Sequence, residues 1–259
     1  MALSIAFAGG ANSTTDNTTL AILITETDIA VGTMLLVTVA AANTGTNGVA
    51  RTATVADDAA SSTNVYTQRG TTGNQTAGTA GDGASQFFFE CPVTTALTAL
   101  THTITVTFSG NVAQKAGQVF VMTPAGGESV IHYATGTASV SAGPTTHDAA
   151  TVSVPNTYSI FGHAAIETDD TVTGDADTTN GNWSTISTQL GDGGNDAASM
   201  TSSVQVKTAT ATGDQSWACT TAVGRDSARN YIIYYSGTPA VAVGLLNTMI
   251  RTGCVIGVP

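Results

Sequence analysis

A stretch of alternating residues constrains the fold of this chain more than any other feature. In residues 101–124, THTITVTFSGNVAQKAGQVFVMTP, the apolar side chains of Ile104, Val106 and Phe108 share one face and threonines share the other. A period of two is typical of an antiparallel strand with one buried face. After a turn at Gly110 comes QVFVM, which is apolar on both faces and predicts a central strand covered twice.

The same unit returns in residues 214–237, DQSWACTTAVGRDSARNYIIYYSG. Upstream features recur in the same order: a pair of apolar segments, two consecutive Asp, an aromatic residue close after an Asn, and the tripeptide GDG at 81–83 and 191–193. Recurrence in tandem predicts a copied β-unit. We therefore expect an all-β fold, a duplicated antiparallel β-sandwich of jelly-roll-like type with two pseudo-symmetric halves.

The boundaries of the halves follow from this recurrence. We expect the first half at residues 1–127, a connecting segment at 128–145 and the second half at 146–237. Residues 238–259 are apolar and predict a final strand or a tail that docks on a neighbour. Glycines, Asn247 and Arg251 interrupt this last stretch, so a membrane-spanning helix and a membrane partner are not expected.

Charge is scarce in this chain. Only 10% of residues are Asp, Glu, Lys or Arg, yet the net charge is -11. Thr, Ser, Asn, Gln and Gly must therefore cover most of the surface. Seven scattered basic residues cannot form a phosphate-binding stripe, so nucleic acid is not an expected partner. Disorder is disfavoured because hydrophobic residues reach 42% and fall in patterned runs.

Cysteines and the N-terminal sequence bear on the compartment. Cys91, Cys219 and Cys254 cannot all pair and show no metal-ligand spacing, so we expect buried free thiols. The start MALSIAFAGG lacks a basic region and has too short an apolar run for a signal peptide. We expect synthesis in a cytoplasm.

No catalytic constellation stands out. His102, His132, His147 and His163 are dispersed, and no G-x-S-x-G turn marks a nucleophile. We expect these histidines to be structural or at the surface, and the protein to be neither an enzyme nor the carrier of a cofactor. A polysaccharide depolymerase is disfavoured because the paired carboxylates lie in loops.

One acidic loop deserves comparison with a calcium site. In ETDDTVTGDADTTNGN, Asp175 and Asp177 alternate as at the start of a calcium loop. Gly181 then lies one position later than that pattern needs, and no Glu closes the loop. A solvated acidic loop is therefore the preferred interpretation, with a calcium site at Asp175 and Asp177 as the alternative.

Aromatic and charged residues supply the candidate contacts with partners. Tyr66 and Trp183 lie at matching places in the two halves, which favours roles in the core, although an exposed Trp183 could bind sugars. The second unit differs from the first by a charged turn. The candidates for binding a partner are Arg225, Asp226 and Arg229 of this turn, together with Trp183.

The segments GTMLLVTV, TNVYTQ, TITVTFSG and QVFVM resemble a duplicated pattern in phage and bacterial proteins, and the chain as a whole resembles bacteriophage virion proteins. The nearest type is the β-sandwich proteins that decorate or cement capsids. This resemblance implies a virion location and, as partners, the major capsid protein or other virion subunits, with homo-oligomers expected. The apolar ends, 1–8 and 241–259, are the expected contact segments. The alternative is a tail, fibre or spike component, or a carbohydrate-binding module, that recognises a host surface.

Overall fold

The fold is built from strands alone. The computed structural model describes residues 3–42, 51–75, 83–195 and 198–238, and these form sixteen β-strands and no α-helix. The predicted all-β class is confirmed. The first eight strands are β1 (Ser4–Ser13), β2 (Asn17–Leu23), β3 (Met34–Ala42), β4 (Ala53–Asp57), β5 (Thr67–Gln75), β6 (Ala84–Pro92), β7 (Thr103–Val112) and β8 (Lys115–Thr123).

These eight strands form two antiparallel sheets. One sheet has the order β1-β8-β3-β6-β5 and the other the order β2-β7-β4. The pairs β1–β8, β2–β7 and β3–β6 are nested, as in a jelly roll. β5 departs from the nesting because it pairs with β6 and not with β4.

The remaining strands repeat this order. They are β9 (Ser129–Thr135), β10 (Ser139–Ser141), β11 (Thr146–Val154), β12 (Ser159–Ile166), β13 (Ser187–Gly191), β14 (Met200–Thr208), β15 (Gly213–Thr220) and β16 (Ser227–Gly237). The larger sheet has the order β10-β16-β12-β14-β13, with β9 also paired to β16, and the smaller sheet joins β11 to β15. A bridge between Thr173 and Thr220 occupies the place of β4. That the halves arose by copying stays a prediction.

The connecting segment 128–145 contains two strands. It supplies β9 and β10, and both pair with β16 of the second sheet. In the second half, β9 and β10 together pair with β16 in the way that β1 pairs with β8 in the first half. The expected boundary before residue 146 therefore divides a sheet. Apart from Thr238, the predicted tail at 238–259 lies outside the described residues.

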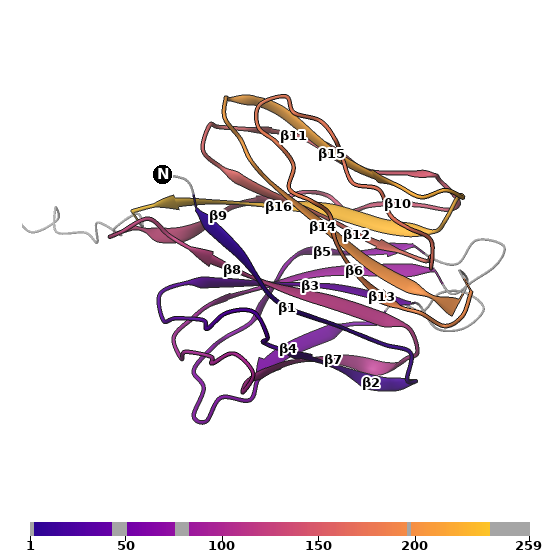
Figure 1. The fold of residues 1–259 in the computed structure, drawn as a ribbon, viewed down its shortest axis with the longest axis horizontal. Helices are drawn as coiled ribbons and strands as arrows, with labels where there is room; N and C mark the ends of the chain where they lie inside the picture. The colour runs from indigo at the N-terminus through magenta and orange to yellow at the C-terminus, as the bar shows by residue number, and fades with distance from the viewer. Residues whose placement is uncertain (1–2, 43–50, 76–82, 196–197, 239–259) are drawn as a thin grey trace, which may run out of the picture.

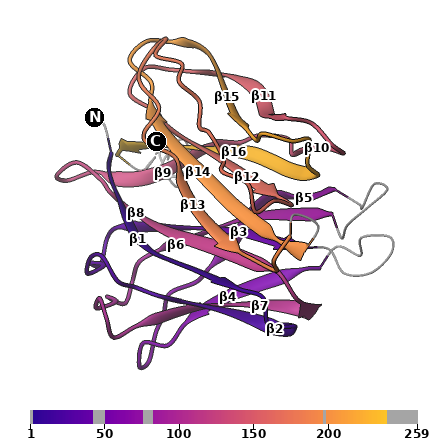
Figure 2. The same ribbon diagram turned by 45° about the vertical axis from the view of Figure 1, so that its right-hand side comes forward.

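The four sheets stack as four layers (Figures 1 and 2). The two large sheets lie in the middle, β2-β7-β4 covers one outer face, and β11-β15 covers the other. The inner strands of the central sheets, such as β3, β6, β8 and β12, are consequently buried on both faces, as predicted for QVFVM in β8. In the outer strand β7, Ile104, Val106 and Phe108 point into the core, as their alternation predicts.

The core between the two halves is not uniform. One part is apolar and includes Leu36, Phe88, Phe120 and Phe161. Another contains small residues, mainly alanines. Buried polar side chains lie in the same central sheets: Thr38, Gln86, Gln118, His163, Ser202 and Asn230. Gln86 Nε2 lies 3.1 Å from His163 Nδ1, and Gln118 Nε2 donates to Ser202 O at 2.9 Å. These bonds cross between the halves and help to fix how the halves fit together.

Candidate functional site

A groove opens where the short strand β13 stops covering β1. β13 pairs with β14 only from Ser187 to Gly191. Before Ser187 the chain forms a loop, and the backbone N–H of Ser184 in this loop donates to Val206 O at 2.8 Å. β14 and the first half of β1 therefore face each other without a strand between them, around a cavity of about 590 Å³.

Two kinds of side chain line the groove. Its apolar wall is formed by Leu3, Ile5, Phe7, Phe120, Val204 and Val206. Its polar side is formed by Asn182, Ser184, Thr185, Ser187, Thr208 and Thr210. The alternation of Leu3, Ile5 and Phe7 along β1 places all three side chains on the face toward β14, which is the signal that sequence reasoning could have used.

The chemistry of the groove suits binding. Among the described residues that line it, none carries an acid, a base or a thiol. Apolar side chains gain free energy by removal from water, and hydroxyls and amides along the edge can hydrogen-bond a peptide backbone or a sugar. The groove therefore fits an uncharged ligand that is partly apolar.

The predicted arm at residues 1–8 has a different role from the one expected. Ser4 to Phe7 pair with β8 of the same chain, from Thr123 to Phe120. The segment is a strand of the first half, and its inward face forms the apolar wall of the groove. Within the described residues, this end of the chain offers a surface to a ligand and does not extend away from the fold.

One buried Ser–His contact resembles part of a catalytic site. His163 Nε2 lies 3.0 Å from Ser202 Oγ, and Gln86 Nε2 lies 3.1 Å from His163 Nδ1. The Gln86 amide donates to Nδ1, so Nε2 carries the proton and donates to Ser202. This is opposite to the direction that activates a serine. Burial lowers the pKa of His163 to about 3, and the ring is closed off from solvent.

His147 takes part in a second buried chain of hydrogen bonds. Arg229 Nη1 donates to Ser227 Oγ at 2.7 Å, and Ser227 Oγ lies 2.9 Å from His147 Nδ1. His147 Nε2 lies 3.0 Å from Thr221 Oγ1, which donates to Val223 O. Burial, with the nearby Arg229 charge, lowers the pKa of His147 to about 4. This series of hydrogen bonds links β11 to β16, and the His147 ring within it is neutral.

The predicted charged turn is engaged inside the chain. Arg229 is buried and donates to Asp148 O at 2.6 Å, and burial lowers the pKa of its guanidinium. Asp226 is buried and accepts from the backbone N–H of Gly143 at 3.1 Å. Arg225 is partly exposed and lies 3.4 Å from Asp170. These contacts give the turn a structural role in closing the second sheet.

Trp183 is an internal residue. Its side chain is 9% exposed and packs against Trp217 with ring centroids 6.4 Å apart. Lys207 Nζ lies 5.4 Å from the centre of its ring. The structure therefore corrects the alternative of an exposed sugar-binding Trp183. Tyr66, at the matching place in the first half, packs against that half's core and donates to Asp57 Oδ2 at 3.1 Å.

Asp175 and Asp177, the two carboxylates of the calcium alternative, already accept hydrogen bonds within the protein. Asp175 accepts from the backbone N–H groups of Asp177 and Ala218, at 2.8 and 2.9 Å. Asp177 accepts from the Thr179 N–H and from Lys207 Nζ, both at 3.0 Å, and these contacts lower its pKa to about 2. Within the described ranges, no three His, Cys, Asp or Glu residues are grouped to hold a metal.

Cys91 and Cys219 are free and buried, as predicted. Burial raises the pKa of each thiol to about 12, which makes both poor nucleophiles. Cys254 lies outside the described residues.

A charged contact between the halves was not predicted. Glu90 of β6 is buried and accepts from Arg69 and from Tyr234 Oη, the latter at 3.0 Å. Burial, followed by the Glu90 charge, raises the pKa of Tyr234 well above its usual value. Because Glu90 and Tyr234 are separated by 144 positions, no local sequence pattern could reveal this contact.

Comparison with known proteins adds no relative. No protein-family model, curated protein or solved structure matches the chain. A search of the described residues finds no helix with the length and apolar character needed to cross a membrane.

Proposed function

We propose that this protein is a structural subunit of a bacteriophage particle, a decoration or cement protein that binds the outside of the head and stiffens it. The observation that carries the proposal is the groove beside β1, whose described lining is uncharged and partly apolar. Such a groove binds an extended segment of a partner. Its described lining contains hydroxyl and amide groups but no acid, base or thiol.

The body around the groove also suits a static role. Four stacked sheets share buried polar contacts, among them the bond from Gln118 Nε2 to Ser202 O at 2.9 Å that joins the two halves. Jelly-roll folds recur in viral capsids and in lectins, although a fold does not by itself specify a function. Each contact with a partner is modest in energy, and symmetric repetition on a shell multiplies it.

The expected partners are the major capsid protein, other virion subunits and further copies of this chain. The deciding experiment counts copies per purified phage particle by quantitative mass analysis. Hundreds of copies, together with lower resistance of particles to heat when the protein is missing, support a role on the head. Absence from purified particles or unchanged heat resistance would overturn it.

A matched pair of variants connects the groove to this role. Ile5→Asp places a charge in the apolar wall and should lower incorporation into particles by about tenfold or more. Leu23→Asp is the control, because Leu23 lies on the exposed side of the outer strand β2. Far-UV circular dichroism checks that both variants are folded. Equal incorporation of the two folded variants would exclude the groove as the contact.

A second candidate function, recognition of sugars on a host surface, is favoured by a different surface. Tyr133, Tyr158 and Tyr235 form a ring cluster in which Tyr158 and Tyr235 stack with centroids 4.6 Å apart. Tyr133 is 45% exposed, and aromatic rings can stack on sugars. Binding to a glycan array that is lost in Tyr133→Ala supports this function. A wild-type protein that binds neither glycans nor host cells excludes it.

A further inference from the structure

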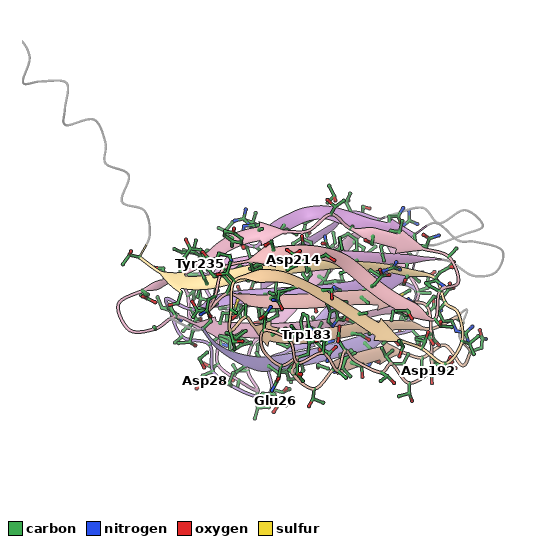
Figure 3. All side chains as sticks on the ribbon, turned by 90° about the horizontal axis from the view of Figure 1, so that it is seen from above. Glu26, Asp28, Trp183, Asp192, Asp214 and Tyr235 are labelled. Atoms are coloured by element: carbon green, nitrogen blue, oxygen red, sulfur yellow. The ribbon has the colours of Figure 1, made fainter. Side chains whose placement is uncertain are left out.

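Thr238, the last described residue, and the opening of the groove lie at the same end of the molecule. Ser159 pairs with Thr208 on one side and with Tyr234 on the other, so the end of β14 is level with the end of β16. The two strands are separated only by β12, about 10 Å in all. Figure 3 shows Tyr235 at this end of the body and Asp192 at the other.

The other wall of the groove reaches the same place. Leu3 precedes Ser4, which pairs with Thr123 at the end of β8. Two residues later, the backbone N–H of Ala125 donates to Ser236 Oγ at 2.9 Å. The start of the apolar wall is therefore close to the last residues of β16.

The sequence that follows β16 has the character that the groove requires. Residues 239–259 contain one charged side chain, Arg251. Before it, in PAVAVGLL, the larger residues Val241, Val243 and Leu245 alternate with alanine and glycine. An extended strand with this pattern presents three branched side chains on one face. The described lining contains no carboxylate to neutralise Arg251, so the uncharged residues 240–250 are the part that fits.

We infer that residues 240–250 of one copy lie in the groove of a second copy, and that the second copy returns the same contact. β16 ends at the edge of the body at Gly237 (Figure 1), and Pro239 restricts Thr238 to an extended conformation. A two-fold axis at this end lets each chain continue in the direction of β16 into the groove of its neighbour. Entry into its own groove requires the chain to reverse immediately after Thr238.

This inference deepens the proposed assembly function by naming the partner at the groove as a second copy of the chain. It describes a reciprocal exchange of strands, in which one contact is made twice about a two-fold axis. Since 240–250 can extend about 3.3 Å per residue, its length exceeds what is needed to follow the strand face from Leu3 to Phe7.

Disulfide trapping in the full chain tests the exchange. In a Cys254→Ser background, Thr185→Cys at the edge of the groove and Val243→Cys in the tail are made in separate chains and mixed. Mild oxidation should give a covalent dimer that thiol reductant reverses, because only an intermolecular contact can join different chains. Ser216→Cys, on the exposed side of the outer strand β15, replaces Thr185→Cys in the control and should give at least about tenfold less dimer.

A chain that carries both Thr185→Cys and Val243→Cys shows whether the tail in a groove comes from the same copy or from a second copy. A disulfide-linked dimer supports the exchange, and an intramolecular disulfide in a monomer overturns it. Absence of any disulfide between these positions also overturns it. A monomer that still binds particles overturns the exchange alone, whereas a trapped dimer that is absent from particles overturns the proposed virion role alone.

A second measurement does not depend on disulfide geometry. Val243→Asp with Leu245→Asp leaves every described residue unchanged and should weaken self-association by about tenfold or more in sedimentation. Val255→Asp is the matched control, since it lies beyond Arg251 and should leave association unchanged. Equal association of all three proteins would overturn the exchange.

Discussion

Tyr234 of the second half donates its hydroxyl to Glu90 Oε2 of the first half, at 3.0 Å and across 144 positions of sequence. Arg69 contacts the other oxygen of the same carboxylate. Both Glu90 and Tyr234 are buried, so the contact joins the two central sheets in a place that water cannot satisfy. The halves are therefore held by specific polar contacts as well as by apolar packing.

Removal of this hydroxyl should destabilise the protein. Tyr234→Phe leaves Glu90 with one fewer donor, and we expect the free energy of unfolding to fall by about 1.5–3 kcal/mol. Tyr133→Phe is the control, because its ring is exposed, and it should cost less than about 0.5 kcal/mol. Urea unfolding of the two variants measures the difference. Equal losses of unfolding free energy in the two variants would show that the hydrogen bond to Glu90 does not stabilise the protein.

The two halves should unfold together. Both tryptophans, Trp183 and Trp217, lie in the second half, so their fluorescence reports on that half alone. Circular dichroism reports on strands throughout the chain. Because the halves share the core that contains Phe120 and Phe161, the two signals should give the same midpoint in urea. Separate midpoints would mean that the shared core does not couple the halves.

Stability should fall in mild acid. The pKa of His147 is lowered to about 4 and that of His163 to about 3, whereas both side chains take up a proton near pH 6.5 once unfolded. The unfolded chain therefore binds more protons below pH 6.5, and folding loses up to about 1.4 kcal/mol per pH unit for each histidine. The loss continues down to about pH 4 for His147 and about pH 3 for His163. Urea unfolding at pH 7.5 and pH 4.5 measures it, and equal stabilities would contradict both assignments.

Two buried lysines should differ in their importance. Lys115 Nζ donates to three backbone carbonyls, those of Thr15, Asn17 and Val112. Lys115→Met removes the donor from all three, and we expect a loss of about 1.5–3 kcal/mol in urea unfolding.

Lys207→Met is the matched control for that measurement. Lys207 Nζ donates to the carboxylate of Asp177, which is 40% exposed and can turn to water. We expect the loss from Lys207→Met to be smaller than that from Lys115→Met. The reverse order would show that the carbonyl contacts of Lys115 are dispensable.

Calcium should leave the melting temperature unchanged. Asp175 and Asp177 already accept hydrogen bonds from three backbone N–H groups and from Lys207. A cation would have to displace these donors. Thermal melts with millimolar calcium and with chelator are expected to coincide, and a clear rise of the melting temperature with calcium would restore the calcium alternative.

Local patterns were sufficient for the class of fold. The alternation of Ile104, Val106 and Phe108 predicted the half-buried β7, and the apolar run in residues 118–122 predicted the twice-covered β8. Period-two burial depends on neighbouring residues of one strand, so it is visible in sequence. The place of Trp183 in the core was also the preferred interpretation, because the matching Tyr66 recurs in the other half.

Contacts between distant strands could not be predicted in this way. Arg229 and Asp226 of the charged turn bond within the second half, and residues 128–145 supply strands that pair with β16, whereas contact of the turn with a partner stays a prediction. The candidate groove depends on β13 being too short to cover β1. None of these facts is encoded in a local period.

The sequence by itself determined that the chain is all β, which strands have one buried face, and that the surface is poor in charge, because each follows from residue types at fixed short spacings. Only the tertiary structure decided that two sandwiches stack through their large sheets and that Glu90 meets Tyr234. It also decided that Leu3, Ile5 and Phe7 form one wall of a groove. The physical reason is that burial and hydrogen bonding between residues far apart in sequence depend on how whole sheets pack, and many packings are compatible with the same alternation.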